Sequence, residues 1–208
     1  MKHILIISIC FLSHFAFNQH YKPFEGIFTY SVEQVDSTLK KAKFISMVYI
    51  YTNDTIVRTD SESASLGKQT LLRHLGLQKQ YVLLEFNSKK YAIQQVIPKD
   101  TSASKYTFKI THKQKRFAGI KAQKVIVTSK NYPFPLTCYF TNTYSPLYLD
   151  VLKGIPGLPT LYFVATENGL LRYTLRKIEP IQLPATTFLF SKDYERISFS
   201  EFIEKISK

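Results

Sequence analysis

Few residues of this chain have the type and spacing that catalysis or metal binding requires. Asp60 and Glu62 form an i, i+2 carboxylate pair, but the stretch of small polar residues around them predicts a solvated loop. The histidines beyond residue 18, His20, His74 and His112, are far apart in the sequence and show no spacing typical of metal ligands. The motifs G-x-S-x-G, G-x-x-x-x-G-K-S/T, H-E-x-x-H and C-x-x-C do not occur. We therefore expect no enzyme, no cofactor and no metal.

The charge distribution permits a different chemistry, the binding of anions. The 208 residues include 28 Lys and Arg against 15 Asp and Glu, a formal net charge of +13. No acidic residue occurs from Thr101 to Leu149. That span contains eight basic residues, Lys105, Lys109, Lys113, Lys115, Arg116, Lys121, Lys124 and Lys130. The stretch 105–130 either contacts an anionic membrane surface or a partner protein, or only covers solvent faces and protects strand edges.

The N-terminus has the pattern of a secretory signal peptide. Lys2 and His3 precede an almost wholly apolar run from Ile4 to Phe17, which is too short to span a bilayer as a helix. We expect removal of residues 1–18, which leaves a single exported domain, residues 19–208, in the periplasm or outer envelope. The alternatives for this run are a buried strand or a membrane anchor. Export argues against nucleic acid as the partner of the basic stretch.

Cys138 is the only cysteine that remains after such processing. It alternates with Leu136 and Phe140, so the three side chains share one face of a predicted strand. A lone cysteine forms no intrachain disulfide. We interpret Cys138 as a small buried hydrophobic residue and not as a reactive thiol.

Alternation of apolar and polar residues predicts a mostly antiparallel β-protein. The stretch from Lys43 to Tyr51 is apolar on both faces, with Phe44, Val48 and Ile50 on one face and Met47 on the other. A strand of this kind is expected to be covered on both sides. The other predicted strands cover residues 28–32, 56–59, 69–75, 81–86, 90–97, 106–111, 122–128, 136–141, 161–166 and 170–178.

Two local signals near the C-terminus are the strongest in the chain. Asn168-Gly169 between two alternating runs predicts a hairpin with these two residues at its tip, because both tolerate positive φ. Asn87-Ser88 is a weaker signal for another tight turn. The one convincing helix is at the end of the chain, where Ser198 or Ser200 can cap it and an apolar stripe recurs at helical spacing. The stripe consists of Phe199, Phe202, Ile203 and Ile206.

A short loop motif resembles the signature of the bacterial GLPGLI family. Residues 154–159 read Gly-Ile-Pro-Gly-Leu-Pro, and Gly154, Pro156, Gly157 and Leu158 match the signature in place. The family also carries an Ala-Gly turn ahead of a basic strand and an aromatic pair followed by Thr. Similar segments stand at residues 117–124 and 139–141, and residues 26–30 are similar to the first strand of the family. The resemblance spans most of residues 24–195.

The chain departs from the family pattern at several positions. Ile155 and Pro159 depart from the signature, and Ala122 and Gln123 stand where the family often has a cysteine. The resemblance therefore implies a divergent member. Members are exported proteins of mostly unknown function, and the family's likeness to curved, open lipoprotein carriers is an analogy of fold. Two glycines around a proline make a fixed loop without catalytic groups, so we interpret the motif as structural.

These observations together predict one strongly curved antiparallel sheet, an open or half-barrel, with a C-terminal helix. With 16 Phe, 14 Tyr and no Trp, the favoured function is non-catalytic binding of an apolar or lipid-like ligand in the concave side. Candidate ligand contacts are Phe44, Met47, Val48 and Ile50. The alternative is a structural or interaction protein of the cell envelope with a filled core and no ligand. An empty apolar cavity favours the first function, and a filled core favours the second.

Overall fold

The computed structural model describes residues 21–36, 38–63, 67–77, 79–96, 106–149 and 151–207. The predicted signal peptide, His20 and Lys105 lie outside the described residues. The strands are β1 (Glu25–Val35), β2 (Ala42–Asn53), β3 (Ile56–Ser63), β4 (Gly67–His74), β5 (Lys79–Phe86), β6 (Lys89–Val96), β7 (Thr107–Phe117), β8 (Ile120–Thr128), β9 (Leu136–Thr141), β10 (Leu158–Thr166), β11 (Gly169–Pro180) and β12 (Glu195–Ser198). The helical elements are η1 (Pro146–Tyr148), η2 (Ala185–Phe188) and α1 (Phe199–Ile206).

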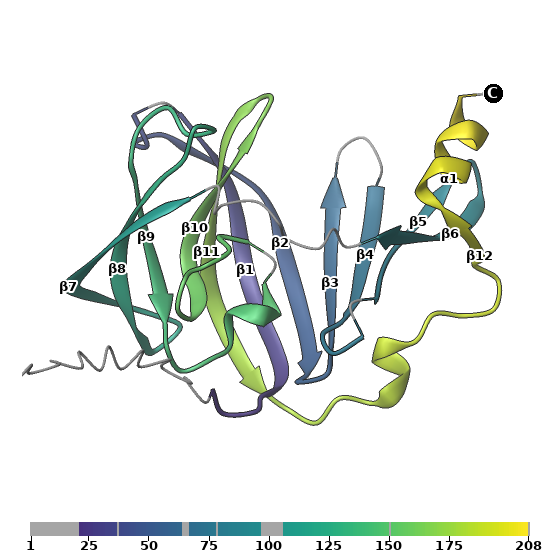
Figure 1. Ribbon diagram of the computed structural model, residues 1–208, viewed down its shortest axis with the longest axis horizontal. Coiled ribbons are helices and arrows are strands. Elements are labelled where there is room, and N and C mark those ends of the chain that lie inside the picture. The colour runs from purple at the N-terminus through teal and green to yellow at the C-terminus, as the bar shows by residue number, and fades with distance from the viewer. Residues whose placement is uncertain are drawn as a thin grey trace, which may run out of the picture.

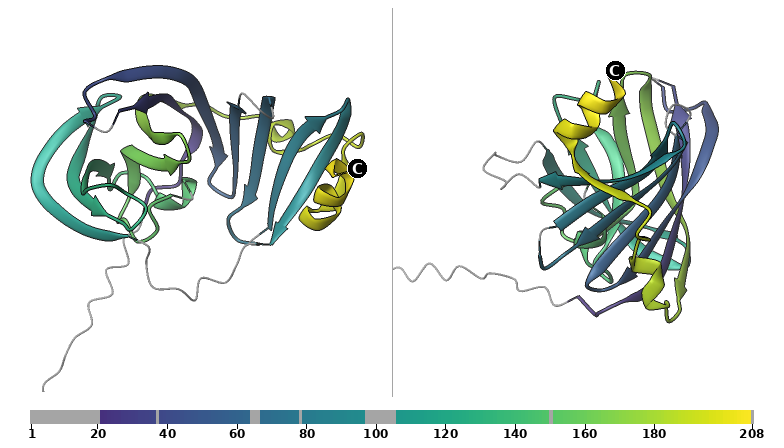
Figure 2. Two further views of the ribbon diagram at one scale, coloured as in Figure 1. Left: turned by 90° about the horizontal axis from the view of Figure 1, so that it is seen from above. Right: turned by 90° about the vertical axis from the view of Figure 1, so that its right-hand side faces the viewer.

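The strands form one mixed sheet in the order β12-β6-β5-β4-β3-β2-β1-β11-β10-β9-β8-β7. The strands from β2 to β7 in this order curl into an open half-barrel, which Figure 2 shows end-on in its left view. The other strands, β3, β4, β5, β6 and β12, form a flatter wing with α1 at its far end (Figure 1). The prediction of a mostly β fold with a curved, open sheet and a C-terminal helix is confirmed.

The sheet is mostly antiparallel, as predicted, and becomes mixed at one edge. After β11 the chain passes through η2 along the wing and adds β12 beside β6 in the parallel direction, with Ile197 opposite Ile93. The connection from β11 is long enough for this crossover, which a short hairpin does not allow. The four-residue strand β12 carries no alternating run that sequence reasoning could have detected.

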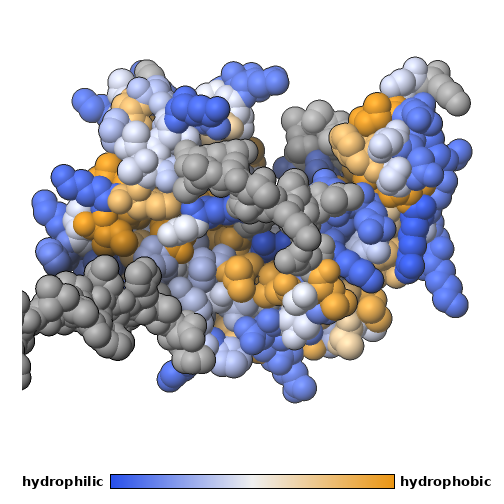
Figure 3. Space-filling model, in the orientation of Figure 1, coloured by the Kyte–Doolittle hydropathy of each residue, from blue (hydrophilic) through white to orange (hydrophobic). Residues whose placement is uncertain are grey.

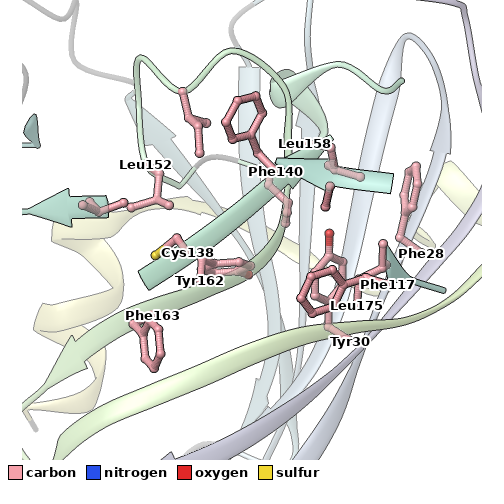
Figure 4. Close-up of a cluster of buried hydrophobic side chains, with 14 of the residues drawn as sticks. Phe28, Tyr30, Phe117, Cys138, Phe140, Leu152, Leu158, Tyr162, Phe163 and Leu175 are labelled. Carbon is pink, nitrogen blue, oxygen red and sulfur yellow. The ribbon is translucent and has the colours of Figure 1, made fainter. Parts of the chain in front are cut away.

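The main hydrophobic core lies inside the half-barrel. It joins β1 and β2 with β8, β9, β10 and β11, and Phe28 and Phe140 are among its residues labelled in Figure 4. Tyr30 is fully buried and donates a hydrogen bond from its hydroxyl to the carbonyl oxygen of Pro159 at 2.7 Å. This bond satisfies a polar group that would otherwise be buried without a partner.

Of the two predicted hairpin turns, the turn between β5 and β6 lies where it was predicted and the turn between β10 and β11 does not. Asn87 and Ser88 both have positive φ, 50° and 59°, and they form the tight turn between β5 and β6 as predicted. The turn between β10 and β11 lies one residue earlier than predicted, because Thr166 pairs with Gly169. Glu167 and Asn168 are therefore the two turn residues. Gly169 opens β11 at a φ of +111°, so the glycine relieves strain beside the turn and not at its tip.

Candidate binding site

The structure settles which face of β2 points inward. Val48 and Ile50 lie in the core of the half-barrel, with 7% and 1% of their surfaces exposed. Met47 lies on the outer face and is half-buried. Because Val48 and Ile50 already pack against other core side chains, only Met47 and its neighbours on that face contact solvent.

Phe44 does not share a face with Val48, contrary to the prediction. The register between β1 and β2 shifts by one residue, since Val32 pairs with Ser46 and Glu33 with Phe44. This β-bulge turns Phe44 outward, where its exposed fraction is 59%. Ile45 and Tyr49 are exposed by 45% and 42%, so the expectation that this strand is covered on both sides is also wrong.

The concave side of the half-barrel is occupied by a segment of the chain itself. Between β9 and β10, residues Tyr148, Leu152 and Ile155 have exposed fractions of 1%, 2% and 3% and belong to the main core. Figure 2 shows this segment, with η1, inside the curve of the sheet. The hydroxyl of Tyr148 donates to the carboxylate of Asp54, and Nη2 of Arg73 donates to the carbonyl oxygen of Leu147 at 2.8 Å. The described residues therefore form a filled core where an apolar ligand was expected.

The loop of residues 154–159, which resembles the family signature, holds this segment in place. Leu158 is fully buried, and its N–H donates to the carbonyl oxygen of Tyr144 at 3.1 Å. Gly157 has a φ of +147°, and a Cβ there would lie 2.2 Å from the carbonyl oxygen of Thr141. Gly154 also has positive φ, and Pro156, between the two glycines, is half-buried. The loop is thus a close backbone contact that only glycine permits, which agrees with its interpretation as structural.

The other candidate chemical groups are dispersed. Cys138 is fully buried, and burial raises the pKa of its thiol to about 12, so the thiolate is strongly disfavoured. Asp60 and Glu62 lie on β3 and not in a loop, and Asp60 accepts hydrogen bonds from Arg58 and Thr70. His74 accepts a hydrogen bond from the N–H of Leu77, and His112 is exposed on β7. In the part of the chain that the structure describes, no three His, Cys, Asp or Glu side chains form a metal site.

Basic residues lie along the sheet edge that β7 and β8 form and in the loop after β8, with Lys121 and Lys124 on opposite sides of the sheet. Lys109, Lys113, Lys121 and Lys130 are exposed, and Lys124 is half-buried. None of these five forms an ion pair with another described residue. Strands β7, β8, β9 and β10 contain no acidic residue. Hydrophilic side chains project over this half of the molecule in Figure 3. We call the exposed side chains of β7 and β8 the basic face.

Sequence reasoning did not find an open polar pocket beside the basic face. The pocket has a volume of about 330 Å³. Its lining consists of Gln114, Lys121, Ala122, Gln123, Phe140, Thr141, Asn142 and Thr143. The polar run Thr-Asn-Thr directly after a strand was the available signal, but only the fold brings it next to Gln114 and Lys121. A second open pocket, of about 470 Å³, lies between the β1–β2 turn and the tip of the β10–β11 hairpin.

Comparisons with known proteins add no further constraint on function. No family model matches the chain, and no curated protein is similar to it. Among the described residues, no helix has the length and apolar character needed to cross a bilayer. The function is therefore inferred from the fold and the surface of the protein.

Proposed function

We propose that the protein is an exported, non-catalytic interaction protein of the cell envelope, and that its basic face binds an anionic surface. The observation that carries the proposal is the set of exposed lysines on β7 and β8, which have no acidic neighbour on their own strands. Uncompensated charges of one sign raise the local concentration of counter-charged groups and steer their approach.

The filled half-barrel favours this role over the carriage of an apolar ligand. Tyr148, Leu152 and Ile155 occupy the concave side, where a lipid chain would have to lie. A carrier needs a pocket that buries most of its ligand. Displacement of these three side chains would expose the core that holds the half-barrel together. The apolar-ligand function stays a prediction, which native mass spectrometry of protein purified from its own host tests by the presence of a bound lipid.

The same lysines also protect a strand edge, since β7 is an edge strand of the sheet. The two roles are compatible, but edge protection alone needs few charges and no extension onto β8. Lys121 and Lys124 lie on β8, which is paired with β7 on one side and β9 on the other. Lys121 is exposed on this paired strand, which supports a binding role for the basic face.

Vesicle co-sedimentation tests the proposal. The protein is expected to bind phosphatidylglycerol vesicles and not phosphatidylcholine vesicles, with an affinity that falls as salt rises. A Lys109→Glu, Lys113→Glu variant should bind about tenfold or more weakly, since each lysine near an anionic surface contributes about 1 kcal/mol. The matched control reverses two exposed lysines of the wing, Lys79→Glu and Lys89→Glu. Equal binding by both variants, or no binding by the native protein, would contradict the proposal.

Export and family membership belong to the same proposal. The apolar run Ile4 to Phe17 and the close contact at Gly157 support an exported, divergent GLPGLI-like domain. N-terminal sequencing of the protein from its host should give a first residue near Gln19 in a fraction outside the cytoplasm. An intact N-terminus in a cytosolic fraction would contradict export.

A further inference from the structure

The polar pocket beside the basic face is built on an irregularity of β7. Ile110 pairs with Val125, but the next pair joins Gln114 to Gln123, so β7 has two residues more than β8 between these positions. The side chain of Gln123 bridges this bulge, because its Nε2 donates to the carbonyl oxygen of Thr111 at 3.0 Å. Bulges of this kind redirect side chains and often stand beside functional sites.

The opposite wall of the pocket is the turn after β9. The hydroxyl of Thr141 donates to that of Thr143 at 3.1 Å, and the N–H of Thr143 lies 3.3 Å from the Thr141 oxygen. Behind the turn, Gly157 approaches the Thr141 carbonyl so closely that no Cβ fits. The family-signature loop therefore fixes the position of this wall, and Phe140, exposed by only 1%, makes a rigid base.

The lining of the pocket has a definite chemical character. Gln114, Gln123 and Asn142 contribute carboxamides, and Thr141 and Thr143 contribute hydroxyls. These groups both donate and accept hydrogen bonds, which suits a ligand with many hydroxyl groups. Lys121 adds one ammonium group, and the lining contains no carboxylate to oppose an anion. The volume of about 330 Å³ is at the lower end of the range for small-ligand sites.

We propose that this pocket binds an acidic sugar unit of an envelope polysaccharide, with Lys121 facing its carboxylate or phosphate. The inference rests on the proposed function, because it names a specific ligand class within the anionic surface that the basic face binds. A lipid acyl chain does not suit the pocket, since Phe140 and Ala122 are its only apolar lining residues and both are buried. The sugar hydroxyls form hydrogen bonds with the carboxamides, and the contact between the acidic group and Lys121 orients the sugar in the pocket.

Isothermal titration calorimetry with three probes tests the inference. The probes are trigalacturonate, the neutral trisaccharide maltotriose, and phosphatidylglycerol vesicles. Native protein is expected to bind trigalacturonate and the vesicles, and to bind maltotriose at least tenfold more weakly than trigalacturonate. The comparison of the two trisaccharides isolates the acidic group.

Three variants distinguish the pocket from the basic face as a whole. Lys121→Gln and Gln114→Ala should each weaken trigalacturonate binding about tenfold. Lys109→Gln is the matched control, because it removes the same charge from an exposed lysine outside the pocket. Lys109→Gln and Lys121→Gln should weaken vesicle binding alike, and Gln114→Ala should leave it unchanged. Thermal melts of all variants verify that they are folded.

The outcomes separate the two proposals. If vesicles bind but trigalacturonate does not, or if Lys109→Gln weakens trigalacturonate binding as much as Lys121→Gln, the sugar site is overturned and the anionic-surface function stands. If neither vesicles nor trigalacturonate bind, both are overturned. If trigalacturonate alone binds and only the pocket variants weaken it, the site stands and the membrane form of the proposed function is overturned.

Discussion

The half-barrel and the wing belong to one sheet, yet they bury their strands in different ways. Among the residues that the structure describes, the core of the half-barrel holds 25 buried hydrophobic residues, whereas the two clusters of the wing hold five and three, so we expect the half-barrel to be the more stable part. The half-barrel curls around a segment from the middle of the chain. The wing stays flatter, and the C-terminal part of the chain covers both of its faces.

Each face of the wing has its own small cluster. On one face, Phe202 of α1 packs against Tyr91 of β6, with ring centroids 5.5 Å apart. On the other, Phe190 packs against Tyr81 of β5, also at 5.5 Å. Because residues 185–206 supply both covers, the comparison teaches that a curved sheet buries its inner face around one enclosed segment, whereas a flatter sheet needs a separate cover on each face.

The largest expected effect concerns the strand that borders both regions. Val48→Ser with Ile50→Ser should lower the free energy of unfolding by about 3–6 kcal/mol, since each buried side chain contributes about 1.5–3 kcal/mol. Met47→Ser on the outer face should lower it by less than about 1 kcal/mol. Urea denaturation measures both. Equal losses from the two faces would show that the outer face of β2 is covered too.

The second prediction separates the wing from the half-barrel. Phe202→Ala should cost about 3 kcal/mol locally, because it removes the side chain that docks α1 on β6. Hydrogen exchange should then become faster in α1, β12 and β6, with β1 and β11 unchanged. Phe199→Ala on the same helix is the control, since its side chain is 56% exposed. Uniform acceleration across the molecule would mean that the two regions unfold as one unit.

The third prediction concerns the signature loop of the half-barrel. Gly157→Ala should destabilise the protein by about 2–3 kcal/mol, because its φ is unfavourable and the new Cβ meets a backbone oxygen. Gly119→Ala also introduces a Cβ at positive φ, but nothing lies within 4 Å of it. The control should therefore cost only about 1–2 kcal/mol. If Gly157→Ala and Gly119→Ala lower the melting temperature equally, the loop has no special role in packing.

The smallest effect uses Cys138 as a reporter of half-barrel opening. Its thiol should react with a disulfide reagent only when the half-barrel opens, so Gly157→Ala should accelerate labelling and Phe202→Ala should not. The raised pKa of the Cys138 thiol also makes stability depend on pH in a definite direction. The native state keeps the thiol proton from pH 9 to about 12, so stability falls across this window as pH rises. Cys138→Ala should make that fall shallower in chemical denaturation.

Alternating runs predicted most strands, because in strands such as β5 and β9 an apolar residue marks the buried face and a polar residue marks the exposed face. The bulge at Ile45 and the one-residue displacement of the hairpin turn before Gly169 were not predictable. Both depend on the register with a neighbouring strand. Of the two predicted caps, Ser198 and Ser200, the structure uses Ser198, because Glu201 completes a capping box with it. The polar pocket escaped detection because its walls are distant in sequence, and only pairing of β7, β8 and β9 unites them.

The position of β1 has a consequence for the order of events during synthesis. Strand β1 lies between β2 and β11, so the hydrogen bonds on one of its edges cannot form until β11, near the other end of the chain, is present. Contacts between such distant residues slow folding. We therefore expect the half-barrel to close only after β11 has been synthesised.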